Sequence, residues 1–248
     1  MIGIFYDTET TGLPLFHEPS EDPRQPHLVQ LAALQVDLDT REILASLDFI
    51  VRPDGWDIPD DVAAIHGITT EDAQWVGVPE AHVLAAFIDL YTAAPNLTQR
   101  IAHNEPFDAR IIRIALKRYA GILDPDVWKA APAECTQRLA TPILKLPPSE
   151  RMRSAGRYHY KSPNLAEAYE HFTGQHLEGA HNAMVDVKAC MAVYFAIKDF
   201  SKLAAAAKAP PVGNAHVASG CEQFPSKPAT PDAPAASTPT IGGLGIIR

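Results

Sequence analysis

The alternation of apolar and polar positions along the chain predicts strands first and helices later. A short apolar run over residues 2–6 is typical of a buried strand, and the runs at 28–37 and 42–51 flank a polar turn, which predicts a hairpin. Helical spacing of apolar residues predicts helices over 80–91, 105–119, 162–172 and 182–200, with another short strand over 100–103. Strands followed by alternating helices indicate an α/β fold.

The composition changes near residue 209, where Ala, Pro, Ser, Thr and Gly replace most large apolar residues. Such a segment buries too little apolar surface to offset its chain entropy. We therefore predict one folded domain over residues 1–205 and a flexible Ala/Pro-rich tail over residues 206–248. Isolated apolar residues in the tail, Phe224 and the terminal Ile246 and Ile247, leave two interpretations open, a partner-docking peptide and an ordinary tail.

Charge and composition narrow the classes of function. The first residues lack a basic segment and lead directly into acids, and no apolar run approaches the roughly 20 residues that span a bilayer, so we expect a cytoplasmic protein with no membrane partner. The three cysteines are widely separated, which predicts neither a disulfide framework nor a zinc site. A formal net charge of −9 argues against a broad basic surface for nucleic acid, so any such contact should be local or metal-assisted.

Two acids, Asp7 and Glu9, follow the first predicted strand. Residues two apart on a strand face the same side, so the two carboxylates should lie next to each other. A calcium-binding EF-hand loop is the nearest alternative, because Asp7, Gly12 and Glu18 fall at its first, sixth and twelfth places. The strand before Asp7 and the prolines after Glu18 argue against that loop. A solvated strand end remains the ordinary explanation of these two acids alone.

Two further acids lie on the apolar faces of predicted helices. Asp108 is in the first turn of the helix that starts after Asn104, a plausible N-cap, and shares a face with Ile111 and Ile112. A favourable interaction with the helix N-terminus explains Asp108 equally well. Asp186 lies on the apolar stripe of the last helix, and His181 comes just before that helix.

Four inward-facing carboxylates would cost many kcal/mol without cations. Two divalent ions, Mg²⁺ or Mn²⁺, would balance them and leave coordination positions for a phosphate and a water. One ion would orient the attacking water, the other would stabilise the leaving 3′ oxygen, and neutral His181 would accept the proton. The pattern therefore predicts phosphodiester hydrolysis.

Three segments in this order resemble the motifs of the DEDD exonuclease superfamily of the histidine-containing type, which includes the proofreading subunit of bacterial DNA polymerase III. They are DTETTGLP at residue 7, HNEPFD at residue 103 and HNAMVD at residue 181. The resemblance covers about residues 1–200 and implies an RNase H-like fold with a mixed sheet of about five strands flanked by helices. It also implies that Asp7, Glu9, Asp108 and Asp186 bind metal, that His181 is the general base and that residues 1–205 are an exonuclease domain.

The same resemblance implies a pocket for the 3′-terminal nucleotide. The segment IPDDVAAIHGIT, which begins at residue 58, resembles the family's segment beside the terminal nucleotide. The residues expected to line the pocket are Thr8, Thr10, Leu13, Ile65, His66, Asn104 and Phe107. Leu13, Ile65 and Phe107 fit ordinary core positions as well. Between the second and third motifs, residues 145–161 carry five basic residues and one acid, with interleaved Tyr158, His159 and Tyr160, which fits either a nucleic-acid contact or a solvated loop.

The expected function is 3′→5′ exonuclease action on DNA, in single-stranded or frayed form, for proofreading or repair. An exoribonuclease of the same superfamily is the first alternative, because the catalytic residues do not report on the 2′-OH. A non-catalytic scaffold is the second, with the tail recruiting a polymerase or clamp. The complete set of four acids and His181 argues against the scaffold.

Overall fold

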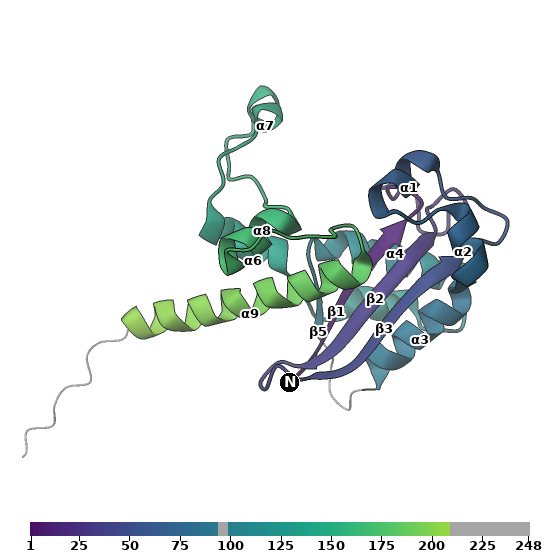
Figure 1. Cartoon of the computed structure of the whole chain (residues 1–248), viewed down its shortest axis with the longest axis horizontal. Helices are drawn as coiled ribbons and strands as arrows, with labels where there is room; N and C mark the ends of the chain where they lie inside the picture. The colour runs from purple at the N-terminus through teal and green to yellow at the C-terminus, as the bar shows by residue number, and fades with distance from the viewer. Residues whose placement is uncertain (94–98, 209–248) are drawn as a thin grey trace, which may run out of the picture. The chain divides into compact units, whose positions relative to one another are not determined.

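The computed structural model describes residues 1–93 and 99–208, which form a mixed sheet flanked by helices (Figure 1). The α/β prediction is therefore confirmed. The elements in chain order are β1 (Ile2–Thr10), β2 (Leu28–Asp37), β3 (Ile43–Arg52), α1 (Asp60–His66), α2 (Thr70–Val76), β4 (Val78–Pro79), α3 (Glu80–Thr92), β5 (Gln99–Ala102), α4 (Glu105–Arg118), α5 (Pro125–Ala130), β6 (Ala133–Cys135), α6 (Thr136–Leu144), α7 (Glu150–Ser154), α8 (Leu165–Thr173) and α9 (Ala183–Lys208).

Within the described residues the sheet has six strands in the order β4-β3-β2-β1-β5-β6. The predicted hairpin is present, since β2 pairs antiparallel with both β1 and β3. Strand β5 lies parallel to β1 on its other side and to β6. Strands β4 and β6, two and three residues long, were not predicted, because they are too short for a periodicity argument to find.

The two faces of β1 pack against different helices. Tyr6 is fully buried beside Phe87 of α3 and Trp128 of α5, with ring centroids 5.6 and 5.8 Å away. Phe5 faces the other way and meets Tyr194 of α9 edge to face at 5.3 Å. Each such aromatic side chain contributes on the order of 2–3 kcal/mol by burial. Odd-numbered residues of β1 therefore face α9, and even-numbered residues face α3, α4 and α5.

Helix ends differ from prediction where local capping decides them. Helix α8 begins at Leu165 rather than 162, because Asn164 caps it in a reciprocal capping box with Glu167. Asn104 does occupy the N-cap position of α4, but it is left-handed (φ 66°) and its side chain makes no capping hydrogen bond, so its predicted capping role is wrong. Asparagine tolerates the left-handed region better than most residues, which explains its presence there.

The predicted domain boundary at residue 205 falls inside α9, which continues to Lys208. The rest of the predicted tail, including Phe224 and its proposed docking role, lies outside the described residues. In the portion that the structure describes, no helix combines the length and the apolar character that crossing a bilayer requires.

Candidate active site

Asp7 and Glu9 lie at the carboxyl end of β1, half-buried, on the face that α9 covers. Burial raises the pKa of Asp7 well above its usual range, and the charges of Asp108 and Asp186 add to the effect. Burial also raises the pKa of Glu9 to about 8, with contributions from the charges of Asp7 and Asp186. The carboxylates of three segments are therefore close enough to repel one another.

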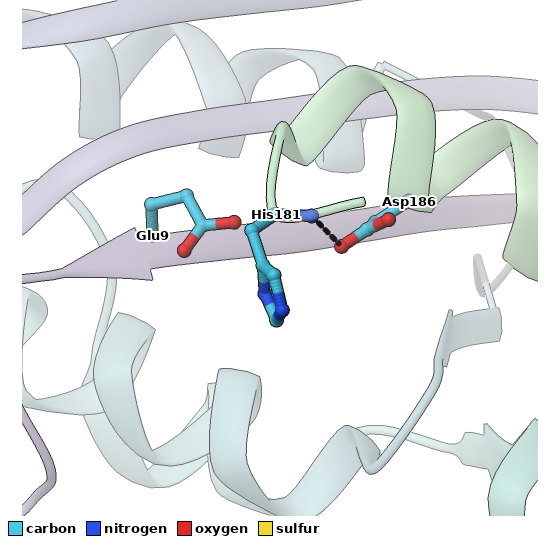
Figure 2. Close-up of side chains that lie close together, drawn as sticks. All are labelled: Glu9, His181 and Asp186. Carbon is cyan, nitrogen blue, oxygen red and sulfur yellow. Dashed lines mark hydrogen bonds between the residues drawn. The ribbon is translucent and has the colours of Figure 1, made fainter. Parts of the chain in front are cut away.

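The start of α9 brings His181 and Asp186 to the same place. Figure 2 shows the carboxylates of Glu9 and Asp186 on either side of His181, and one ligand atom from each of the three residues lies within 4.8 Å of the others. His181 has a left-handed backbone (φ 67°), and its N–H donates to Asp186 Oδ2 over 3.1 Å. A non-glycine residue in this region is strained, and such strain is often kept where a site requires it.

Asp108 reaches the site from the first turn of α4. Its Oδ1 accepts two hydrogen bonds from Thr8, from the backbone N–H at 3.1 Å and from the hydroxyl at 2.8 Å. Burial raises the pKa of Asp108 to about 8, although the two bonds from Thr8 oppose the shift. These bonds hold Oδ1, and the other oxygen makes no hydrogen bond within the described residues. Thr8 thus orients a carboxylate, a contact distinct from the expected nucleotide contact.

Gln30 of β2 fixes the start of α9, a role that sequence reasoning missed. Its buried side chain accepts from the Ala183 N–H at 3.1 Å and donates to Asp48 Oδ1 at 2.8 Å. A helix has free N–H groups at its start, and Gln30 satisfies one of them from the sheet. The available signal was a glutamine in the otherwise apolar first half of the strand LVQLAALQVD.

The structure separates the expected nucleotide-pocket residues into exposed and packed ones. Leu13 and Ile65 are 74% and 57% exposed, so their interpretation as core residues is wrong and the substrate interpretation remains. Phe107 is partly buried and packs against the core cluster of α3 and α4. Thr10 is buried, with its hydroxyl donating to the Gly12 carbonyl at 2.8 Å. Asn104 is exposed at the start of α4.

His66, at the end of α1, is a buried histidine with an unused donor. Its Nδ1 accepts from the Ile68 N–H at 3.1 Å, so the proton of the neutral ring is on Nε2. Nε2 is buried and has no partner within the described structure. Burial lowers the pKa of His66, and the nearby charge of His181 lowers it further. The ring is therefore a neutral N–H donor near His181.

The donor set suits a hard divalent cation. Oxygen ligands from carboxylates are what Mg²⁺ and Mn²⁺ prefer, and a histidine nitrogen is compatible with Mn²⁺. Asp186 Oδ1 is buried and has no hydrogen-bond partner among residues 1–93 and 99–208, a situation that costs about 1–3 kcal/mol unless a ligand satisfies the oxygen. Burial is the largest cause of the raised pKa values of Asp7 and Glu9, and the charges of neighbouring carboxylates add to it.

Comparisons with known proteins identify the family of this chain. A family model described as "Exonuclease" matches residues 4–194, which include all five candidate catalytic residues. No curated protein matches the sequence.

Solved structures of E. coli exonuclease I share the fold. The complex with a dT13 oligonucleotide is 21% identical with a TM-score of 0.64, and the match covers 83% of this chain and 43% of that one. A zinc-bound complex with single-stranded DNA is 22% identical with a TM-score of 0.62, covering 81% and 41% of the two chains. The complex with dA16 is 24% identical with a TM-score of 0.60, covering 80% and 41%. The chain thus spans less than half the length of the exonuclease I chains.

Proposed function

Because this chain belongs to the exonuclease family, we propose that it is a metal-dependent enzyme that removes nucleotides from the 3′ end of single-stranded DNA. The observation that carries the proposal is the convergence of Glu9, His181 and Asp186, with ligand atoms within 4.8 Å of one another, on a carboxylate cluster. Asp7 and Asp108 belong to the same cluster, because the charge of Asp108 contributes to the raised pKa of Asp7.

Asp7, Glu9, Asp108 and Asp186 would hold two Mg²⁺ or Mn²⁺ ions, which when bound orient and acidify a water and offset the charge on the leaving oxygen. The chain's own part is to fix these carboxylates before substrate arrives. Thr8 orients Asp108 with two hydrogen bonds, and the His181 N–H orients Asp186. Fixed carboxylates of this kind need little rearrangement during the reaction.

His181 is the proposed general base. Its ring is exposed and lies beside Glu9 and Asp186, where a water next to a scissile phosphate would stand. The backbone of His181 is tied to Asp186, so the ring is held at the site without losing contact with solvent. A proton taken from the attacking water can then pass to bulk water.

His66 and the exposed apolar residues would receive the terminal nucleotide. The buried Nε2–H of His66 is an unused donor suited to a phosphate or base acceptor, and a neutral ring does not compete with cations for the site. Leu13 and Ile65 present apolar surface on which a terminal base could rest. Thr10, Asn104 and Phe107 would complete the pocket.

DNA is preferred over RNA in this proposal because the fold is similar to exonuclease I structures that hold dT13 and dA16. The exoribonuclease alternative shares the same catalytic residues. A polymerase or clamp partner, and the more specific likeness to a polymerase proofreading subunit, stay predictions from the sequence.

The test uses the full chain and a 5′-fluorescein 20-mer, as DNA and as RNA of the same sequence, with Mg²⁺, Mn²⁺ or EDTA. We expect the wild type to produce a ladder of shortened DNA only when Mg²⁺ or Mn²⁺ is present. The Asp7→Asn variant should produce no ladder. Asp89→Asn, a change at an exposed acid of α3, is the matched control and should behave like wild type. Intact substrate with both ions, or equal degradation by Asp7→Asn, would overturn the proposal, and faster loss of RNA would select the ribonuclease.

A further inference from the structure

A basic arm, defined as residues 145–161, leaves the fold between α6 and α8. Figure 1 shows α7 at the end of two connecting segments, away from the sheet. The Lys161 N–H donates to the Leu146 carbonyl at 3.0 Å and closes the base of the arm. At the tip, Ser149 caps α7, and the Arg157 N–H returns to the Met152 carbonyl at 2.8 Å. The arm thus has local structure of its own.

The arm carries a charge opposite to that of the chain. It has five basic residues and one acid, whereas the chain as a whole has a net charge of −9. Lys161 pairs with Glu167, and Arg153 donates to the Pro148 carbonyl at 2.8 Å. The exposed side chains of Arg151 and Arg157 form no hydrogen bond or ion pair within the described residues. Two guanidinium groups therefore remain available to an anion.

Aromatic side chains stand among these charges. Tyr158 and Tyr160 are 75% and 49% exposed, and His159 between them is exposed as well. Neither tyrosine stacks on another aromatic ring in the described structure. Arginines bind phosphates, and exposed aromatic rings stack on unpaired bases, so this combination fits single-stranded nucleic acid better than it fits an acidic protein or a duplex.

His103 links the base of the arm to the sheet. The ring Nε2–H of His103 donates to the Pro163 carbonyl at 3.1 Å, two residues after the arm ends, and Nδ1 lies 2.9 Å from the Thr136 hydroxyl. His103 follows β5, which runs parallel beside β1. The arm therefore starts at the end of the sheet where Asp7 lies.

We propose that the basic arm binds the single-stranded segment upstream of the 3′ end while the terminal nucleotide occupies the candidate active site. This inference rests on the proposed function for the position of that end. Arg151 and Arg157 contact phosphates, and Tyr158 and Tyr160 stack on bases. The arm supplies a local concentration of positive charge in a chain whose net charge is −9.

The test measures binding and hydrolysis separately on the full chain. Binding of fluorescein-dT20 is followed by anisotropy in EDTA from 50 to 300 mM NaCl, with duplex DNA for comparison. Each phosphate contact to a single strand contributes about 0.7 to the slope of log affinity against log salt, so Arg151→Gln with Arg157→Gln should lower the slope by about 1.4. With the 1 M salt affinity as the reference, this slope change lowers the dT20 affinity of the arginine variant by up to about 25-fold at 0.1 M salt.

The aromatic contribution has its own variant, and the charge change its own control. Tyr158→Ala with Tyr160→Ala should weaken dT20 binding about fivefold or more per base lost, with the salt slope unchanged. The control for the charge change is Lys129→Gln with Lys202→Gln, which removes two positive charges from exposed positions of α5 and α9. Its dT20 affinity and its salt slope should stay near those of wild type. Hydrolysis of a trinucleotide, too short to reach the arm, should be unaffected in all three variants.

The results separate the arm from the catalytic proposal. Loss of dT20 affinity with normal trinucleotide hydrolysis supports the arm. If the arginine variant and the lysine control bind dT20 equally well, the proposed role of the arm is overturned, even if the wild type hydrolyses DNA. If dT20 binding depends on the arm but the wild type hydrolyses no DNA, the proposed role of the arm stands and the exonuclease proposal is overturned. If the wild type neither binds nor hydrolyses DNA, both proposals are overturned.

Discussion

Glu9→Gln should stabilise the metal-free protein at alkaline pH, although it removes a predicted metal ligand. The folded protein raises the pKa of Glu9 from 4.5 to about 8, through burial and through the charges of Asp7 and Asp186. Below pH 4.5 the carboxyl is protonated in both the folded and unfolded states and costs nothing. Between pH 4.5 and 8 the unfolded chain releases a proton that the folded chain keeps, so the free energy of unfolding falls as pH rises.

The size of the effect follows from the width of that window. At 1.36 kcal/mol per pKa unit, the full cost above pH 8 is about 5 kcal/mol, and Gln, which has nearly the same shape and no charge, avoids it. With an m-value near 3 kcal/mol/M, appropriate for a chain of this size, the urea midpoint of Glu9→Gln should exceed that of wild type by about 1.5 M at pH 8.5.

The assay is urea denaturation followed by tryptophan fluorescence in EDTA at pH 4, 6 and 8.5. Glu42→Gln is the matched control, because Glu42 is exposed and its side chain makes no hydrogen bond or ion pair in the described part of the chain. Saturating Mg²⁺ should raise the midpoint of wild type more than that of Glu9→Gln. Equal midpoints at pH 8.5, or a difference as large at pH 4, would refute this electrostatic account.

Three other changes test the rest of the site. His181→Ala should lower kcat by about 10²–10⁴, the usual range for a general base, while oligonucleotide binding by anisotropy persists; normal turnover would remove the residue from that role. Asp186→Ala should abolish DNA shortening yet leave the melting temperature in EDTA unchanged or higher, and a clearly lower value would contradict the repulsion described above. Gln30→Ala leaves the Ala183 N–H unsatisfied and should cost about 1–3 kcal/mol in urea unfolding, with faster hydrogen exchange at Ala183 and reduced kcat; unchanged exchange would exclude a positioning role.

The longer strands and the inward orientation of the individual acids could be predicted because both depend on short-range patterns. The hairpin of β2 and β3 follows from period-two alternation and a polar turn, and Asp7 and Glu9 share a face for the same geometric reason. Asp108 shares a buried helix face with Ile111 and Ile112, as its spacing indicated. The prediction of an exonuclease is confirmed at the level of the family.

Features that depend on long-range contacts were not predictable in this way. Gln30 lies 153 residues from Ala183, and no local pattern connects them. Asn104 and His181 both adopt left-handed backbone conformations, and in His181 the conformation directs an N–H to Asp186. Such conformations follow from the surrounding packing, which propensities of single residues do not contain. Short elements such as β4 and α7 fall below the length at which periodicity carries information.

The distribution of charge connects the site with the arm. Burial raises the pKa values of Asp7 and Glu9, so without metal these groups tend to keep their protons and offer a phosphate backbone no positive charge. The cluster therefore contributes little attraction of its own to a long strand. In our proposal the exposed positive charges of Arg151 and Arg157 act on that strand at a different place, with or without a metal. In the proposed function, cations determine whether the 3′ end reacts, and the proposed arm determines how strongly the strand behind it is held. An acidic chain with a net charge of −9 is thereby compatible with a nucleic-acid substrate.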